Sequence, residues 1–139
     1  MQETPIFVVH DRDQALRVAH ASQISGVAVQ LFSAKAAASS LGPETFQAII
    51  NEARHRYPSA RIECFLDCAE DAGLALAALR RCTSHISVTL PPQAQKKITE
   101  IARQRGAHVR SYPKHGMDLA FAEYHDKDLA DYIRKQPIK

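Results

Sequence analysis

The sequence predicts an α/β protein: a single three-layer α/β/α domain of the Rossmann-like or flavodoxin-like kind, with a five-stranded, mostly parallel sheet. Five apolar segments alternate along the chain with helical patterns, and such alternation favours parallel strands joined by right-handed crossovers. The length of 139 residues and the hydrophobic content of 45% suit one domain over residues 1–139. Five strands are too few for a closed barrel, so the alternative is a half (β/α) barrel that a partner subunit completes.

The first two strands are predicted where short apolar runs occur. Ile6–His10 is apolar on consecutive residues, as expected of a strand that is covered on both faces. Asp11 follows as a helix N-cap with Gln14 three residues later, which is the spacing of a capping box, and Gly26 ends this helix. The second predicted strand is Val27–Phe32.

The middle of the chain continues this alternation after a long connection, Ser33–Gly42. Pro43 begins a helix whose apolar residues recur at helical spacing, and Pro58 ends it. The third predicted strand is Ile62–Leu66. The next helix, Ala72–Arg81, is apolar on nearly all sides, and a helix without a polar face is usually covered on both sides. This pattern predicts a homodimer formed through Ala72–Arg81.

The C-terminal part supplies the last two predicted strands. Ile86–Leu90 alternates apolar and polar residues, which indicates that one of its faces is less buried. Pro92 opens the following helix, and His108–Tyr112 is polar enough to be an edge strand. Residues 126–134 have a helical pattern, and residues 117–124 fit either a helix or a short extended segment.

Charge and cysteine content limit the classes of partner. The net charge is +3, and residues 80–114 hold eight basic residues against one acid. No stacking aromatic residues are interleaved with these charges, so the pattern does not favour nucleic acid as a partner. No segment is apolar enough for a membrane span, and the N-terminus lacks a signal-peptide pattern. Three cysteines without metal-ligand spacing predict a cytoplasmic protein with reduced thiols and no metal site.

The candidate site lies at the carboxyl ends of the predicted strands, because open parallel sheets bind their ligands there. The candidates are polar residues at or just after the first four strands, namely His10, Asp11, Ser33, Lys35, Asp67 and Thr89. Lys35 stands among hydroxyl residues, which suits a phosphate or a carboxylate, and the imidazole of His10 suits a ligand or a general base. Asp11 has the competing role of a helix cap, whereas Asp67 has no such role. The sequence contains no dinucleotide, P-loop or serine-hydrolase motif, and it identifies neither a cofactor nor a catalytic residue.

Acidic residues follow the first strand at Asp11 and Asp13 and the third strand at Asp67, and Thr89 lies near the end of the fourth. This arrangement resembles response-regulator receiver domains, which have acids, a phosphorylated aspartate and a hydroxyl residue at these places. The chain departs from that family after the fifth strand, where Tyr112–Lys114 reads Tyr-Pro-Lys instead of placing lysine before proline. The resemblance implies an analogy of fold and not phosphotransfer.

We therefore expect the protein to bind a small molecule or a phosphate-type ligand at the carboxyl rim of the sheet, with no reaction assigned to it. A second hypothesis is a receiver-like protein-interaction or oligomerisation module without catalytic activity, which acts through the helix Ala72–Arg81. A third is polyanion binding through basic residues of the two later helices, Arg80, Arg81, Lys96, Lys97, Arg103 and Arg105.

Overall fold

The structure, a computed structural model, describes residues 4–81, 84–120 and 126–135. Its strands are all parallel and form one open sheet of six strands in the order β5-β4-β3-β2-β1-β6. They are β1 (Ile6–Val9), β2 (Val29–Ser33), β3 (Ile62–Asp67), β4 (His85–Ser87), β5 (Val109–Arg110) and β6 (Met117–Asp118). The predicted α/β fold with an open, mostly parallel sheet is confirmed, and the number of strands is corrected from five to six.

Helices separate most of the strands, as the alternating pattern predicted. They are α1 (Arg12–Ser25), α2 (Ala37–Ser40), α3 (Pro43–Arg56), α4 (Ala72–Arg81), α5 (Pro92–Gln104) and α6 (Asp126–Arg134). The predicted cap of α1 is confirmed, because the Asp11 carboxylate accepts a hydrogen bond from the Gln14 N–H at 2.8 Å. At the other end of α1, Gly26 has the left-handed φ of 72° that favours glycine.

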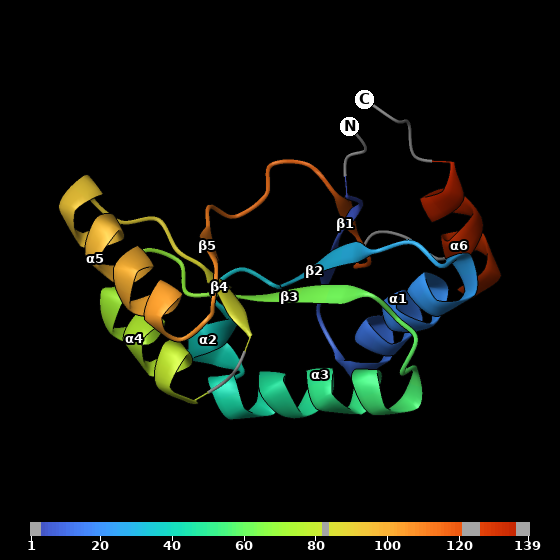
Figure 1. Cartoon of the computed structure of the whole chain (residues 1–139), viewed down its shortest axis with the longest axis horizontal. Coiled ribbons are helices and arrows are strands. Elements are labelled where there is room, and N and C mark those ends of the chain that lie inside the picture. Colours follow the sequence, from blue (N-terminus) through green and yellow to red (C-terminus); the bar gives the residue numbers. More distant parts are fainter. Residues whose placement is uncertain (1–3, 82–83, 121–125, 136–139) are drawn as a thin grey trace.

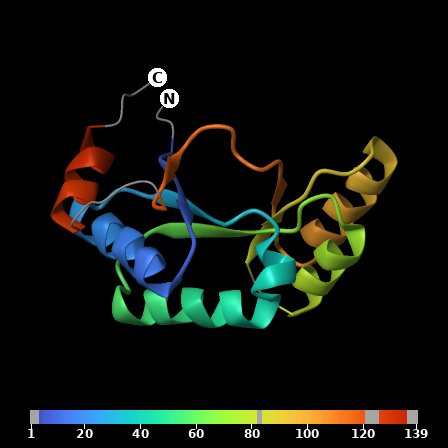
Figure 2. The same cartoon turned by 180° about the vertical axis from the view of Figure 1, so that it is seen from behind.

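The two faces of the sheet are covered by different parts of the chain. Strands β1 to β5 follow one another in a single direction across the sheet, so right-handed crossovers place their helices on the same face. Figure 1 shows α1, α3 and α4 below the sheet, whereas residues 111–116, which connect β5 to β6, arch over the opposite face; Figure 2 shows the same arrangement from behind. We call the face under this connection the open face.

Alternation along the strands divides the apolar side chains between these faces. Phe7, Leu31 and Leu66 belong to the large core on the helical face. The intervening Val8, Phe32 and Phe65 form a smaller buried cluster on the open face, against which Ile6 and Tyr112 pack. The open face is therefore an apolar floor that one connection covers in part.

The apolar helix α4 packs against α2, α3 and α5 of its own chain. Its residues Ala75, Ala78 and Leu79 are buried, and Leu74 and Leu76 pack half-buried against the core. Among the described residues, the large apolar side chains that remain exposed are Ile24 and Leu41, neither of them on α4. A homodimer formed through Ala72–Arg81 stays a prediction.

The sixth strand includes the first two residues of the segment 117–124, for which the sequence left a helix and a short extended segment as alternatives. Met117 and Asp118 are extended and pair with Phe7 and Val8 at the edge of the sheet. Residues 121–124 lie outside the described part of the chain. The extended alternative is thus confirmed for the first two residues of the segment.

Candidate functional site

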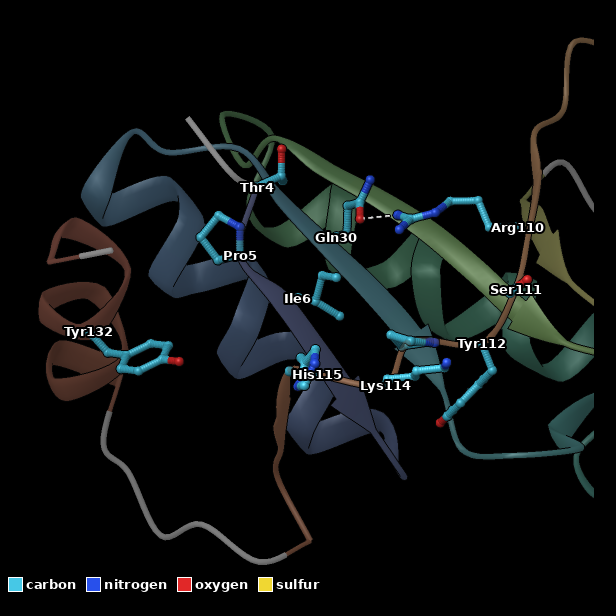
Figure 3. Close-up of a pocket in the computed structure, with 12 residues that line it drawn as sticks. Thr4, Pro5, Ile6, Gln30, Arg110, Ser111, Tyr112, Lys114, His115 and Tyr132 are labelled. Atoms are coloured by element: carbon cyan, nitrogen blue, oxygen red, sulfur yellow. Dashed lines mark hydrogen bonds between the residues drawn. The ribbon is translucent and has the colours of Figure 1, made fainter. Parts of the chain in front are cut away.

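A pocket of about 870 Å³ lies on the open face, beneath the β5–β6 connection (Figure 3). Its volume falls within the range of roughly 300–1,000 Å³ that is usual for small-molecule sites. Its walls come from the start of β1, from β2, from the connection and from α6: Thr4, Pro5, Ile6, Gln30, Arg110, Ser111, Tyr112, Pro113, Lys114, His115, Gly116 and Tyr132. We call this cavity the open-face pocket.

The charged groups of this pocket are basic. Arg110, Lys114 and His115 line it, and none of the described lining residues carries a carboxylate. Within the described part of the chain, neither the Lys114 ammonium nor the His115 ring makes a hydrogen bond or ion pair, and both side chains are exposed. These two groups can therefore donate to an anion that enters the pocket.

The Arg110 guanidinium is held in place from two directions. It donates a hydrogen bond to the Gln30 side-chain oxygen, and it lies 5.6 Å from the ring centroids of both Phe32 and Phe65. The Gln30 amide in turn donates to Glu63 at 2.8 Å. Aromatic faces attract a cation without neutralising it, so Arg110 presents an oriented positive charge at the floor of the pocket.

Tyr112 fastens the connection to the sheet. Its hydroxyl donates to the backbone oxygen of Ser33 at 2.9 Å, and its ring packs edge-on against Phe32. Burial, together with the negative charges of Asp67 and Asp118, raises the pKa of Tyr112 to about 12. The tyrosine therefore stays protonated at neutral pH and keeps this hydrogen bond.

Gly116 lets the connection pass close to β1. Its φ is +149°, a value that L side chains rarely adopt, and a Cβ atom built there would lie 3.0 Å from the backbone oxygen and the Cγ2 atom of Ile6. β6 begins at the residue after Gly116. The close approach of Gly116 to Ile6 therefore determines where Lys114 and His115, just before it, lie above the sheet.

Three of the sequence-predicted residues lie around a second, smaller cavity at the carboxyl rim. His10, Asp11 and Ser33 line a cavity of about 140 Å³ together with residues of α2 and α3. The His10 ring nitrogen Nε2 lies 2.6 Å from a carboxylate oxygen of Asp118, and Asp11 caps α1. This cavity is smaller than usual small-molecule sites, whereas the open-face pocket is not.

Asp67 makes its hydrogen bonds within the protein. It is 3% exposed, and its two carboxylate oxygens accept from the Ala36 N–H and the Ser87 hydroxyl, both at 2.7 Å. Its own N–H donates to the Ser33 hydroxyl oxygen at 2.9 Å. The residue at the place of the receiver-domain phosphorylation site is thus buried beneath the loop that follows β2.

Lys35 and Thr89 line neither cavity and are exposed. The Lys35 ammonium lies 5.7 Å from the ring centroid of Tyr112, and the Thr89 N–H donates to the backbone oxygen of Ala69. The structure brings Ser33 and Asp67 into contact, but it does not gather all six predicted residues around one cavity.

A cluster of possible metal ligands, which the sequence spacing did not indicate, lies at the amino ends of the strands. Glu63 on β3 approaches His85 on β4 and His108 before β5, with its Oε2 atom 3.6 Å from His85 Nε2 and 3.4 Å from His108 Nδ1. These separations are near those of ligand atoms around one zinc ion.

The hydrogen bonds of His85 do not fit that role. Its Nδ1 accepts from the His108 backbone N–H at 2.8 Å, so in the neutral ring the proton resides on Nε2. A protonated Nε2 has no lone pair to offer a metal toward Glu63. Burial lowers the pKa of His85 despite the attraction of Glu63, which favours this neutral form. The two imidazole rings are also stacked, with centroids 4.5 Å apart, so one ion cannot lie in both ring planes.

Sequence reasoning therefore missed most of the open-face pocket. Its candidates came from the carboxyl ends of strands, whereas Pro5 and Tyr132 belong to the first and last described segments. The available signal was the excess of basic residues in residues 80–114, which includes Arg110 and Lys114.

None of the described helices has the length and apolar composition needed to cross a membrane. In the comparisons with known proteins, no protein-family model matches this chain and no curated protein matches its sequence.

Proposed function

We propose that this protein binds a small anionic molecule, with a phosphate or carboxylate group, in the open-face pocket. The observation that carries the proposal is a cavity of about 870 Å³ with three basic lining residues and no carboxylate on its described walls. The ligand class is the one expected from the sequence, and the site is the open face instead of the carboxyl rim. No reaction is assigned to the site.

The polar groups of the pocket support an anionic ligand over a neutral one. A basic cavity with apolar walls concentrates anions, because the local field is screened less there than in bulk water. Arg110 is oriented by Gln30 and two aromatic rings, so little side-chain freedom is lost when it binds an oxyanion.

Isothermal titration with pyrophosphate at low ionic strength tests the proposal. The wild-type protein is expected to bind, and Lys114→Met to bind roughly tenfold or more weakly, since hydrogen bonds to charged groups contribute about 1.5–3 kcal/mol. The matched control is Lys97→Met, which removes the same charge from an exposed position on α5. Absence of binding, or an equal loss in the two variants, would contradict a site in this pocket.

A further inference from the structure

Polar side chains of three strands meet on the open face beside the pocket. Gln30 on β2 and Glu63 on β3 are paired directly across the sheet, so their side chains project from the same face. Two residues further along these strands, Phe32 and Phe65 occupy that face as well. Arg110 reaches from the edge strand β5 over both rings to the side chain of Gln30 (Figure 3).

The Glu63 carboxylate has neighbours on two sides. Its Oε1 atom accepts a hydrogen bond from the Gln30 amide nitrogen at 2.8 Å. Its Oε2 atom lies 3.6 Å from His85 Nε2 and 3.4 Å from His108 Nδ1. Glu63 does not line the pocket, and within the described part of the chain it forms no ion pair with Arg110. The carboxylate therefore meets the guanidinium only through the amide of Gln30.

The amide of Gln30 lies between a carboxylate and a guanidinium. A glutamine amide has a donor end and an acceptor end, and rotation of the side chain exchanges their places. Because Glu63 accepts from the amide nitrogen, the amide oxygen faces Arg110 and accepts from its guanidinium. Each of these hydrogen bonds polarises the amide in the sense that strengthens the other. A carboxylate in direct contact would neutralise Arg110, whereas the amide oxygen orients it and leaves its charge for a ligand.

We propose that Glu63 is a positioning residue of the open-face pocket, which acts through Gln30 to hold the Arg110 guanidinium in the orientation that binds an anion. This inference rests on the proposed function and adds to it a residue that does not line the pocket. It gives a negative charge two opposite effects on the affinity. By its charge Glu63 repels an anionic ligand, whereas as a hydrogen-bond acceptor it favours binding of that ligand.

Two neutral substitutions of Glu63 separate these effects. Glu63→Gln and Glu63→Met remove the same charge, but only the glutamine keeps an oxygen that can accept from Gln30. In titrations with pyrophosphate, Glu63→Met is expected to bind roughly threefold or more weakly than Glu63→Gln. Equal affinities of the two variants would overturn the inference.

The same pair of substitutions in a Gln30→Met background is the control. Methionine cannot connect residue 63 to Arg110 by hydrogen bonds, so the two double variants should bind pyrophosphate with equal affinity. A difference that persists in this background would show that Glu63 acts by another route, and it would overturn the inference as well.

A measurement without ligand tests the positioning of Arg110 directly. The NMR order parameter of the Arg110 Nε–H group reports how firmly the guanidinium is held, and it should be lower in Glu63→Met than in Glu63→Gln. Equal order parameters would overturn the positioning role even where the affinities differ. Absence of pyrophosphate binding to the wild-type protein would instead overturn the proposed function, whereas wild-type binding with equal affinities of the two Glu63 variants overturns the inference alone.

Discussion

Asp67 lies at the end of a strand, where the sequence predicted a functional residue, but its carboxylate is buried as structural carboxylates are. Both of its side-chain oxygens accept hydrogen bonds from groups of the protein, the Ala36 N–H and the Ser87 hydroxyl. Ala36 has a φ of +59°, a left-handed conformation that costs a non-glycine residue roughly 1–2 kcal/mol. The Asp67 carboxylate therefore has a specific task, which is to hold the loop after β2 in a strained conformation.

Two substitutions of Asp67 show whether its hydrogen bonds or its negative charge stabilise the protein. Asp67→Ala is expected to lower the free energy of unfolding by about 2–4 kcal/mol, because two donors lose their acceptor in a buried place. Asp67→Asn keeps an acceptor for Ala36 and offers a donor to the Ser87 oxygen, so its loss should be less than half as large. Urea denaturation followed by circular dichroism measures both losses, and equal losses would contradict the structural interpretation.

At the scale of elements, the β5–β6 connection is the segment on which the open-face pocket depends. Gly116→Ala is expected to displace this connection, since the new Cβ would lie 3.0 Å from Ile6 in a backbone conformation that alanine rarely adopts. We expect a weaker affinity for pyrophosphate together with a loss of stability of about 1–3 kcal/mol.

Gly106→Ala is the matched control for that substitution. Gly106 also has a positive φ, +73°, but a Cβ atom there meets nothing within 4 Å. Its loss of stability should be only about 1 kcal/mol, with the affinity for pyrophosphate unchanged. If both variants bind pyrophosphate as the wild type does, the close approach of the connection to β1 is not needed for the pocket.

The elements that the sequence predicted well are those with several residues of clear periodicity. The apolar run at β1, the capped helix α1 and the proline-started helix α3 all follow from local patterns, and β5 is the predicted edge strand. β6 was not identified as a strand because its two residues, Met117 and Asp118, have no pattern of their own and are extended through pairing with β1. Whether so short a segment becomes a strand depends on its pairing with another strand of the fold. The local sequence does not show that pairing.

At the scale of the whole molecule, strand order determines where a ligand can bind. The alternation of strands and helices predicted parallel strands, but not that β1 to β5 would advance in one direction. That order leaves the face opposite the helices to the β5–β6 connection, and the cavity there is larger than the one at the carboxyl rim. Polar residues at strand ends could be found from the sequence, whereas the pocket combines residues as distant as Pro5 and Tyr132.

The stability of the whole molecule should depend on pH through His85. Burial lowers the pKa of this histidine, and repulsion by His108 and Arg54 adds to that effect, while Glu63 opposes it. In the unfolded chain the same ring titrates near its ordinary pKa of about 6.5. Above that pH the His85 ring is neutral in both the folded and the unfolded protein. Below it, the ring takes up a proton in the unfolded chain, whereas in the folded protein it does so only at a lower pH. Acidification therefore favours unfolding, by at most about 1.4 kcal/mol per pH unit for one such group.

His85→Asn tests this dependence, because an asparagine oxygen can still accept from the His108 N–H but does not titrate. Between about pH 6.5 and pH 5, the free energy of unfolding should fall less steeply for this variant than for the wild type. Urea denaturation at half-unit pH intervals measures the two slopes. The salt-bridged Glu52, whose pKa is lowered by Arg12, loses its contribution only below about pH 4.5 and lies outside this window. His55→Gln, which removes an exposed histidine of α3, should keep the wild-type slope. An unchanged slope in His85→Asn would mean that the half-buried imidazole of His85 is not what makes this protein sensitive to acid.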